Sequence, residues 1–132
     1  MFLLPPPSVM GGIYIPSGIG RNKWGWTTLM PILMYGIAPN LNKGASATSI
    51  KSTDTARKNG HPCPKPVSWM EWLVGLATDK NDIVFDPFMG SGTTLVAASK
   101  LGRKAIGIEI SKEYCDIAIK RLESGIQLER IQ

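Results

Sequence analysis

The stretch "FDPFMGSGTTLVAASKLGRKAIGIEI", residues 85–110, is the part of the chain whose pattern decides the fold. A short apolar run leads into a turn that contains Gly90 and Gly92, and a helix-forming segment follows. A second apolar run, residues 104–108, then ends at Glu109. A strand, a tight turn, a helix and a second strand in this order predict a right-handed unit on a parallel sheet, and therefore an α/β fold.

A helix is expected before this unit, in the sequence "SWMEWLVGL". Ser68 and Glu71 have the spacing of a capping box. Four apolar residues recur at helical spacing: Trp69, Trp72, Leu73 and Leu76. We interpret both tryptophans as core residues, because an apolar stripe of this kind normally packs inward.

Two further helices are expected in and after the unit. The first opens at Thr93, whose hydroxyl is suited to capping, and stops before Gly102. The second covers residues 111–124, with Ser111 as its N-cap and Gly125 beyond its end. Its apolar face is Tyr114, Ile117, Ala118 and Leu122. The whole order, strand–helix–strand–helix, is a βαβα unit on a partial sheet.

The first 60 residues are less regular. Short strands are expected at Ile13–Ile15 and at Ile32–Tyr35, with Pro31 at the first position of the second strand, where a missing N–H is tolerated. Residues 37–60 are small, polar and basic without periodicity, so we expect one long loop there.

Charge is distributed unevenly along the chain, whose net charge is +5. Residues 1–60 carry six basic residues and one acid, whereas residues 61–132 carry nine of each. A basic half suggests a polyanionic partner, and a solvated basic segment is the other interpretation. The length and the 43% apolar content fit one globular domain or part of one. We divide the chain into two regions, residues 1–60 and residues 61–132.

The two cysteines, Cys63 and Cys115, lie far apart without metal-ligand spacing, which favours a reduced, intracellular chain and predicts no metal site. The first residues, "MFLLPPPSVM", lack a basic segment and contain three prolines, so they do not predict a signal peptide. No run reaches the about 18 apolar residues of a membrane span. We therefore expect a cytoplasmic protein.

The glycine turn and Glu109 together suggest a ligand that contains a ribose. In such a unit the ligand lies past the carboxyl end of the first strand. An acid about 20 residues further on binds the ribose hydroxyls, and Glu109 lies 19 positions after Gly90. A phosphate-binding loop is excluded, because no glycine-lysine-serine/threonine string is present.

Two classes of ribose-containing cofactor remain for this turn. A dinucleotide fold has a third glycine where this chain has Leu95, and Asp86 would repel a diphosphate. S-adenosylmethionine has a ribose, no phosphate, and ammonium and sulfonium charges that suit a nearby acid. The remaining interpretation is a plain tight turn, with Glu109 as a surface acid.

"DPFMGSGTT" closely resembles the first cofactor motif, Asp-Pro-Phe-x-Gly-Ser-Gly-Thr-Thr, of S-adenosylmethionine-dependent DNA methyltransferases that modify N6 of adenine or N4 of cytosine. "GIEISKEYCDIAIKRL" looks like the segment that follows that motif. "HPCPKPVSWMEWLV" is similar to the family motif His-Pro-x-x-Lys-Pro and precedes the glycine motif, as in one family subgroup. The resemblance covers residues 61–124 and implies a Rossmann-like, class I methyltransferase fold of prokaryotic or phage type.

The resemblance also implies roles for individual residues. It places the cofactor turn at Asp86, Pro87, Phe88, Gly90, Ser91, Gly92 and Thr93. Glu109 would bind the ribose hydroxyls, with Ile110 against the adenine. Lys65 and Pro66, with His61 near them, would close the methionine side of the cofactor.

One motif of the family is missing. The family activates the exocyclic amine, a poor nucleophile, with a motif Asp/Ser/Asn-Pro-Pro-aromatic, whose ring stacks on the flipped-out base. The nearest match, "LPPPS" at residues 4–8, lacks both the side-chain acceptor and the ring. We therefore expect no catalytic residue in this chain. We interpret it as the C-terminal part of such an enzyme, after the catalytic motif.

The missing part has structural consequences. A parallel sheet of two or three strands exposes an edge, so we expect the chain to be poorly stable alone or to pair with an upstream polypeptide. Ile32–Tyr35 would be a late strand of the same sheet, with Trp24 and Trp26 packed under it. The basic loop, residues 37–60, would contact DNA phosphates. The alternatives are a non-catalytic remnant that binds cofactor or a partner, and a methyltransferase of RNA or another amine.

Overall fold

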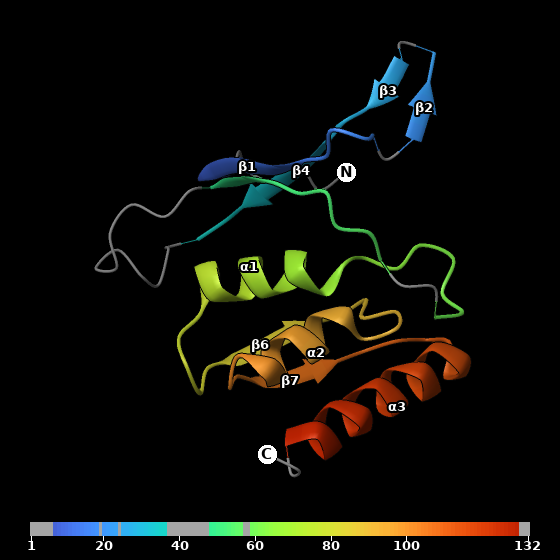
Figure 1. The fold of residues 1–132 in the computed structure, drawn as a ribbon. Helices are drawn as coiled ribbons and strands as arrows, with labels where there is room; N and C mark the ends of the chain where they lie inside the picture. The colour runs from blue at the N-terminus through green and yellow to red at the C-terminus, as the bar shows by residue number, and fades with distance from the viewer. Residues whose placement is uncertain (1–6, 19, 24, 37–47, 57–58, 130–132) are drawn as a thin grey trace, which may run out of the picture. The chain divides into compact units, whose positions relative to one another are not determined.

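The computed structural model describes residues 7–18, 20–23, 25–36, 48–56 and 59–129. Contacts between residues divide the chain into two compact units, Met1–Thr53 and Asp54–Gln132. Every described pair of strands lies within one of these units (Figure 1).

The first unit is built around a three-stranded sheet in the order β4-β1-β5. The central strand, β1 (Val9–Tyr14), pairs antiparallel with β4 (Leu29–Met34) and parallel with β5 (Ser49–Lys51). Ile13 of β1 is fully buried. The most buried apolar side chains described in this unit, Ile13 and Ile15, therefore lie on or directly after β1.

Both strands expected in this unit are present, with different limits. The strand expected at Ile13–Ile15 is β1, which begins earlier, and the strand expected at Ile32–Tyr35 is β4. Pro31 is the third residue of β4 and is tolerated there because β4 is an edge strand. β2 (Gly20–Asn22) and β3 (Gly25–Thr27), which were not expected, form a separate antiparallel ribbon.

Two expectations for this region are wrong. β4 is not a late strand of one parallel sheet, because it pairs antiparallel with β1 in a sheet separate from the strands of the second unit. Residues 37–60 are not one long loop, because β5 lies within them. Residues 37–47 and 57–58 lie outside the described part of the chain, as do Trp24 and the side chain of Trp26.

The second unit has the βαβα order that the sequence predicts. β6 (Ile83–Asp86) leads through the glycine turn into α2 (Thr93–Lys100), and β7 (Lys104–Gly107) leads to α3 (Lys112–Glu129). β6 and β7 are parallel. α1 (Val67–Ala77) packs on α2, which also contacts α3 and lies between these two helices in Figure 1.

Small residues let α2 approach its neighbours closely. A Cβ atom added to Gly107 of β7 would lie 2.9 Å from the side chain of Leu95, so α2 packs directly on the strand. Ala97 and Ala98 of α2 are fully buried, and Ala118 of α3 nearly so. The close approach of these three elements fixes the position of the turn from which α2 begins.

The start of α1 differs from the expectation. The helix begins one residue before Ser68, and Pro66 occupies the cap position without a side-chain hydrogen bond. The Ser68 hydroxyl donates to Asp54, and Glu71 pairs with Lys100 of α2 at 3.0 Å. The predicted capping box is therefore wrong, because both of its residues have tertiary partners instead.

The limits of α2 and α3 are partly as expected. Thr93 is the first helical residue of α2, not its cap, because Gly92 occupies the cap position in a left-handed conformation with φ 74°. Ser111 does cap α3, since its hydroxyl accepts a hydrogen bond from the Tyr114 N–H at 3.4 Å. The predicted end of this helix at Gly125 is wrong, because α3 continues through it for another turn.

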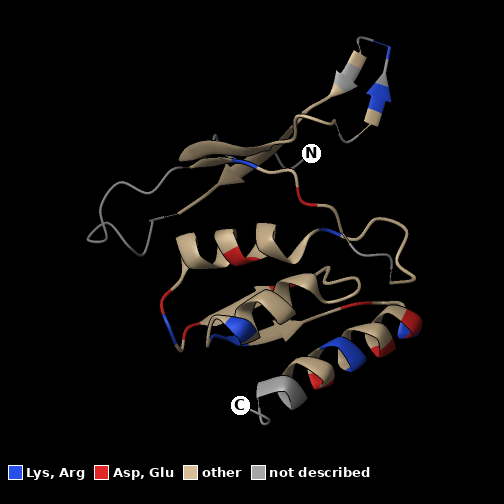
Figure 2. Ribbon diagram, in the orientation of Figure 1, with Lys and Arg blue, Asp and Glu red and all other residues tan. Residues whose placement is uncertain are grey.

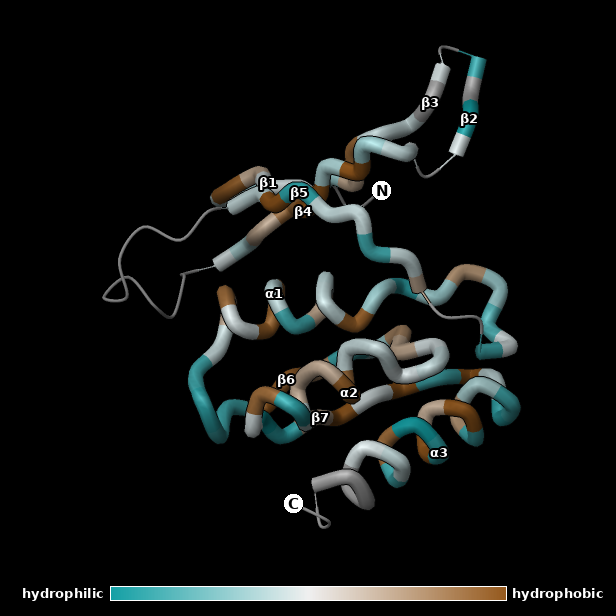
Figure 3. The backbone as a smooth tube through the Cα atoms, in the orientation of Figure 1, coloured by the Kyte–Doolittle hydropathy of each residue, from teal (hydrophilic) through white to brown (hydrophobic). Residues whose placement is uncertain are grey.

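One face of the β6-β7 sheet carries exposed apolar side chains. Phe85 and Ile106 lie opposite each other in the parallel register and are 57% and 54% exposed, and Ile83 is 61% exposed. Residues two apart on a strand share a face, so these three side chains form one surface. α2 packs on the other face, at Gly107. Figure 3 shows strongly apolar positions along both strands.

Candidate functional site

The turn between β6 and α2 depends on two glycines with positive φ angles, 51° at Gly90 and 74° at Gly92. A Cβ atom at Gly90 would lie 2.9 Å from Nε2 of His61, and one at Gly92 would lie 2.7 Å from the Cβ of Ala118. Both positions therefore require glycine twice over, for the backbone conformation and for space. The turn is closely enclosed by α3 and by the segment that contains His61.

The beginning of the turn is tied to both strands. Asp86, the last residue of β6, accepts a hydrogen bond on Oδ1 from the Phe88 N–H at 3.0 Å, which is a local Asx turn. The Met89 N–H donates to the carbonyl of Ile108 at 3.0 Å, and the Ile108 N–H donates to the carbonyl of Asp86, also at 3.0 Å. The turn therefore lies directly beside the end of β7.

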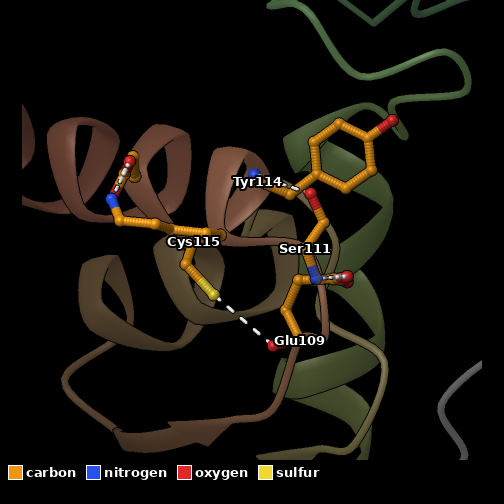
Figure 4. Close-up of polar contacts among 6 residues, drawn as sticks. Glu109, Ser111, Tyr114 and Cys115 are labelled. Carbon is orange, nitrogen blue, oxygen red and sulfur yellow. Dashed lines mark hydrogen bonds and ion pairs between the residues drawn. The ribbon is translucent and has the colours of Figure 1, made fainter.

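Glu109 lies at this end of β7, and its carboxylate is held by backbone groups. Oε2 accepts a hydrogen bond from the Gly90 N–H at 3.0 Å, and Oε1 accepts one from the Ser111 N–H at 2.8 Å. Figure 4 shows Glu109 beside Ser111, with the thiol of Cys115 directed at the Glu109 carbonyl, 3.6 Å away. The structure thus brings the predicted acid to the predicted turn, across 19 positions of sequence.

Ser91 and Thr93 are buried, and their hydroxyls face other parts of the protein. Asn59 donates from Nδ2 to Oγ of Ser91 at 3.0 Å. Arg121 of α3 donates to the Ser91 carbonyl, to Oγ of Ser91 and to Oγ1 of Thr93, the last two at 3.2 Å. Partial burial lowers the pKa of Arg121 from its ordinary value, because the charged form is desolvated.

Sequence reasoning missed Asn59 and Arg121. One signal was available for Arg121: it lies three residues after Ala118, and therefore on the helix face expected to be apolar. A basic residue on such a face needs a partner inside the protein. No comparable signal exists for Asn59, which precedes the segment with the recognisable motif.

The segment from His61 to Pro66 lies on the other side of the turn. Nδ1 of His61 accepts a hydrogen bond from the Cys63 N–H at 3.1 Å, and its ring lies 4.6 Å from that of Tyr114 between centroids. Lys65 donates from Nζ to the sulfur of Cys63 at 3.1 Å, and Pro66 is buried. His61 therefore approaches the turn, whereas the ammonium of Lys65 is held within its own segment.

Two apolar side chains near the turn are almost completely exposed. Phe88, within the turn, is 87% exposed, and Ile110, directly after Glu109, is 101% exposed relative to its reference value. Pro87 is also exposed. The surface around the carboxylate therefore offers apolar contacts beside a charged acceptor.

Among the described residues, no group of three or more His, Cys, Asp or Glu side chains is arranged to hold a metal ion. None of the helices in the same described ranges combines the length and the apolar character needed to cross a membrane.

Comparison with known proteins assigns the chain to a family. A family model described as DNA methylase, of the N6/N4 type, matches residues 21–120. The chain therefore belongs to the N6/N4 DNA methylase family, which confirms the resemblance read from its three motifs.

Individual relatives agree with this family. The chain is 40% identical over 96 residues to the type II methyltransferase M2.LlaDCHI of Lactococcus lactis subsp. cremoris, covering 69% of this chain and 36% of the relative. It is 51% identical over 70 residues to the orphan methyltransferase M.BamHII of Bacillus amyloliquefaciens, covering 53% of this chain and 26% of the relative. The chain thus spans well under half the length of these relatives.

A solved structure supports the fold. The chain resembles the crystal structure of an M1.HpyAVI–SAM complex with a TM-score of 0.66 and 34% identity, over 87% of this chain and 61% of that one. The predicted class I methyltransferase fold, with an incomplete sheet, is therefore confirmed.

Proposed function

We propose that the chain binds S-adenosylmethionine at the turn between β6 and α2, as part of a DNA methyltransferase that acts on N6 of adenine or N4 of cytosine. The Glu109 carboxylate carries the proposal. Each carboxylate oxygen can accept two hydrogen bonds, and each accepts one here, from Gly90 or from Ser111. One acceptor site remains on each oxygen, which suits the two neighbouring hydroxyls of a ribose.

The other residues of the turn fit the rest of the cofactor. The exposed side chains of Phe88 and Ile110 offer apolar surface for an adenine ring. Asp86 supplies a negative charge near the turn for the ammonium and sulfonium groups. Lys65 and Pro66 would close the methionine side. The bound cofactor would supply an electrophilic methyl group.

Ser91, Gly92 and Thr93 would contribute through the backbone. The hydroxyls of Ser91 and Thr93 are hydrogen-bonded inside the protein, so we infer that they hold the shape of the turn and do not contact the ligand. Gly90 and Gly92 carry no side chain, so a ligand can approach the main chain between β6 and α2 closely.

The direct test is calorimetric titration of the purified chain with S-adenosylmethionine, followed by an assay of tritium transfer to duplex DNA. We expect saturable binding of one molecule per chain and no transfer above background, because the amine-activating motif is missing. A folded chain that fails to bind would overturn the proposed cofactor site. Transfer by the chain alone would overturn our assignment of amine activation to another polypeptide.

We further propose that a polypeptide carrying the amine-activating motif covers the apolar face of β6 and β7. The support is the shared surface of Ile83, Phe85 and Ile106, each more than half exposed. Parallel sheets are normally covered on both faces. A partner that supplies an apolar helix or strand would remove this surface from water.

Stability of the isolated chain tests this partner. We expect the chain alone either to self-associate or to melt below about 45 °C, which is the lower limit for ordinary domains. The double substitution Phe85→Thr and Ile106→Thr should reduce self-association while changing the free energy of unfolding by only about 0.5 kcal/mol, as for exposed sites. Light scattering and thermal melts measure both. A cooperative melt of the unmodified chain as a stable monomer at higher temperature would contradict the proposal.

DNA contact by the first unit is the third part of the proposal. Arg21 lies on β2, Lys23 directly follows β2, and Lys51 lies on β5; all three are exposed. Figure 2 shows basic positions on the β2-β3 ribbon in blue. Exposed cations on a narrow ribbon suit contacts to phosphates, which position a protein on DNA without reading its sequence.

Salt dependence tests these contacts. For duplex DNA, the logarithm of the affinity should fall with the logarithm of salt concentration by about 0.9 per neutralised phosphate. Replacing Arg21 or Lys23 with alanine should reduce that slope by about one each. Lys100→Ala, in α2, is the matched control, because Lys100 already pairs with Glu71. Equal slopes for all variants would exclude the ribbon as the contact.

A further inference from the structure

Arg121 belongs to α3 and is 30 residues away from Ser91 in sequence, yet its side chain donates a hydrogen bond to Ser91 in the glycine turn. We propose that Arg121, together with Asn59, is a positioning residue that holds the turn in its ligand-binding conformation. We call the hydrogen bonds of Arg121 and Asn59 to the turn the brace. The effect of the brace on ligand binding rests on the proposed function of the turn as the S-adenosylmethionine site. The brace itself is a property of the free protein.

The hydrogen bonds of Arg121 are directed at the part of the turn that is hardest to hold. Ser91 lies between two glycines whose φ angles are 51° and 74°. Glycine gives the backbone the most freedom to leave such a conformation. Nη1 of Arg121 donates to both the carbonyl and the hydroxyl of Ser91, and to Oγ1 of Thr93 at 3.2 Å. One guanidinium therefore fixes the turn on the side that faces α3.

Asn59 extends this contact to the opposite wall of the site. Its Nδ2 donates to Oγ of Ser91 at 3.0 Å, and its Oδ1 accepts a hydrogen bond from the His61 N–H at 3.1 Å. Ser91, which is only 3% exposed, thus receives hydrogen bonds from two directions. α3, the turn and the segment that begins at His61 are joined through one hydroxyl.

The position of Arg121 is difficult to explain by packing alone. The side chain is partly buried, and within the described ranges it has no ion pair with a carboxylate. A partly buried charge costs stability unless it is well hydrogen-bonded. The guanidinium of Arg121 donates its hydrogen bonds to oxygens of Ser91 and Thr93. An unbranched apolar side chain such as methionine would fill most of the same space without holding the turn.

Amide hydrogen exchange and ligand titration on the full chain test the brace. The variants are Arg121→Met, which keeps an unbranched apolar stem without a donor, and Arg121→Lys, which keeps the charge and one donor group. Lys120→Met, at an exposed neighbouring position, is the control. We expect Arg121→Met to speed exchange at Gly90 and Gly92 about tenfold and to weaken S-adenosylmethionine binding about tenfold, as for one charge-assisted hydrogen bond. Arg121→Lys should show smaller changes in both the exchange rate and the affinity, and Lys120→Met should leave the exchange rate and the affinity unchanged.

Two results would overturn the brace. One is unchanged exchange at Gly90 and Gly92 in Arg121→Met. The other is an equal increase at Ala97, in the middle of α2, which would indicate general loss of stability. If the unmodified chain does not bind S-adenosylmethionine, the proposed function fails. The exchange measurement on the free protein then still decides whether Arg121 holds the turn.

A double-mutant cycle with Asn59→Ala provides a second test. Arg121 and Asn59 donate to the same hydroxyl of Ser91, so their effects on exchange at Gly90 should not be additive. We expect the double variant Asn59→Ala and Arg121→Met to differ from the product of the single effects by about threefold or more, because neighbours in one network couple. Strict additivity would exclude coupling of the two walls through Ser91.

Discussion

Glu109→Ala is expected to abolish calorimetrically detectable binding of S-adenosylmethionine, with at least about a hundredfold loss of affinity. The substitution removes the acceptors for both ribose hydroxyls. Hydrogen bonds to a charged group contribute about 1.5–3 kcal/mol each, and about 1.4 kcal/mol is tenfold in affinity. It also leaves the Gly90 N–H without its partner, which loosens the turn.

Glu109→Gln separates charge and geometry. The amide keeps the shape of the side chain, but its NH₂ group must face the N–H of either Gly90 or Ser111, and both are donors. We therefore expect binding almost as weak as in Glu109→Ala. Glu113→Ala, at an exposed acid in the first turn of α3, is the matched control and should bind normally. Normal binding by Glu109→Ala would disprove the assigned ribose contact.

Gly92→Ala is expected to lower the free energy of unfolding by about 2–4 kcal/mol. An alanine at φ 74° costs about 1–2 kcal/mol. Its Cβ atom would also lie 2.7 Å from the Cβ of Ala118, and forced overpacking costs about 1–3 kcal/mol. Denaturant unfolding followed by circular dichroism measures the change. The same variant should lose cofactor binding, because Gly92 is the cap residue at which the turn passes into α2.

Gly75→Ala is the matched control for this substitution. Gly75 lies within α1, is exposed, and has nothing within 4 Å of an added Cβ atom. Alanine in a helix interior is favoured over glycine by about 1 kcal/mol, so this variant should be slightly more stable than the unmodified chain. Equal stability of the Gly92 and Gly75 variants would refute the close approach of α3 to the turn.

The βαβα unit could be predicted because its signals are local. Gly90 and Gly92 mark a turn that only glycine adopts easily, and alternation of apolar runs with helix formers marks the elements around it. Parallel strands end at the same edge of a sheet, so the expected closeness of Glu109 to the turn followed from topology. Its hydrogen bond to Gly90 agrees with that reasoning.

The starts of α1 and α2 could not be predicted as that of α3 was, because the side chains expected to cap them have partners elsewhere in the unit. Ser68 is three residues from Glu71, but its hydroxyl donates to Asp54, 14 positions earlier. The hydroxyl of Thr93 is engaged by Arg121 of α3. Local spacing indicates what a side chain can do, and tertiary contacts select among those choices.

The first unit was predicted least well because its pairing is remote. β1 pairs in parallel with β5, where Ile13 lies opposite Ile50, and this pairing leaves no signal in either short segment. Pro31 suggested the start of a strand, yet it lies inside β4, since an edge position makes a missing N–H harmless.

The division of the chain at Thr53 has an evolutionary consequence. All eleven residues expected to contact the cofactor, from Lys65 to Ile110, lie in one continuous segment with its own core. No described strand pairing connects that segment with the residues before it. A single genetic crossover near Thr53 would therefore transfer the entire site between genes as one cassette, leaving every described sheet whole.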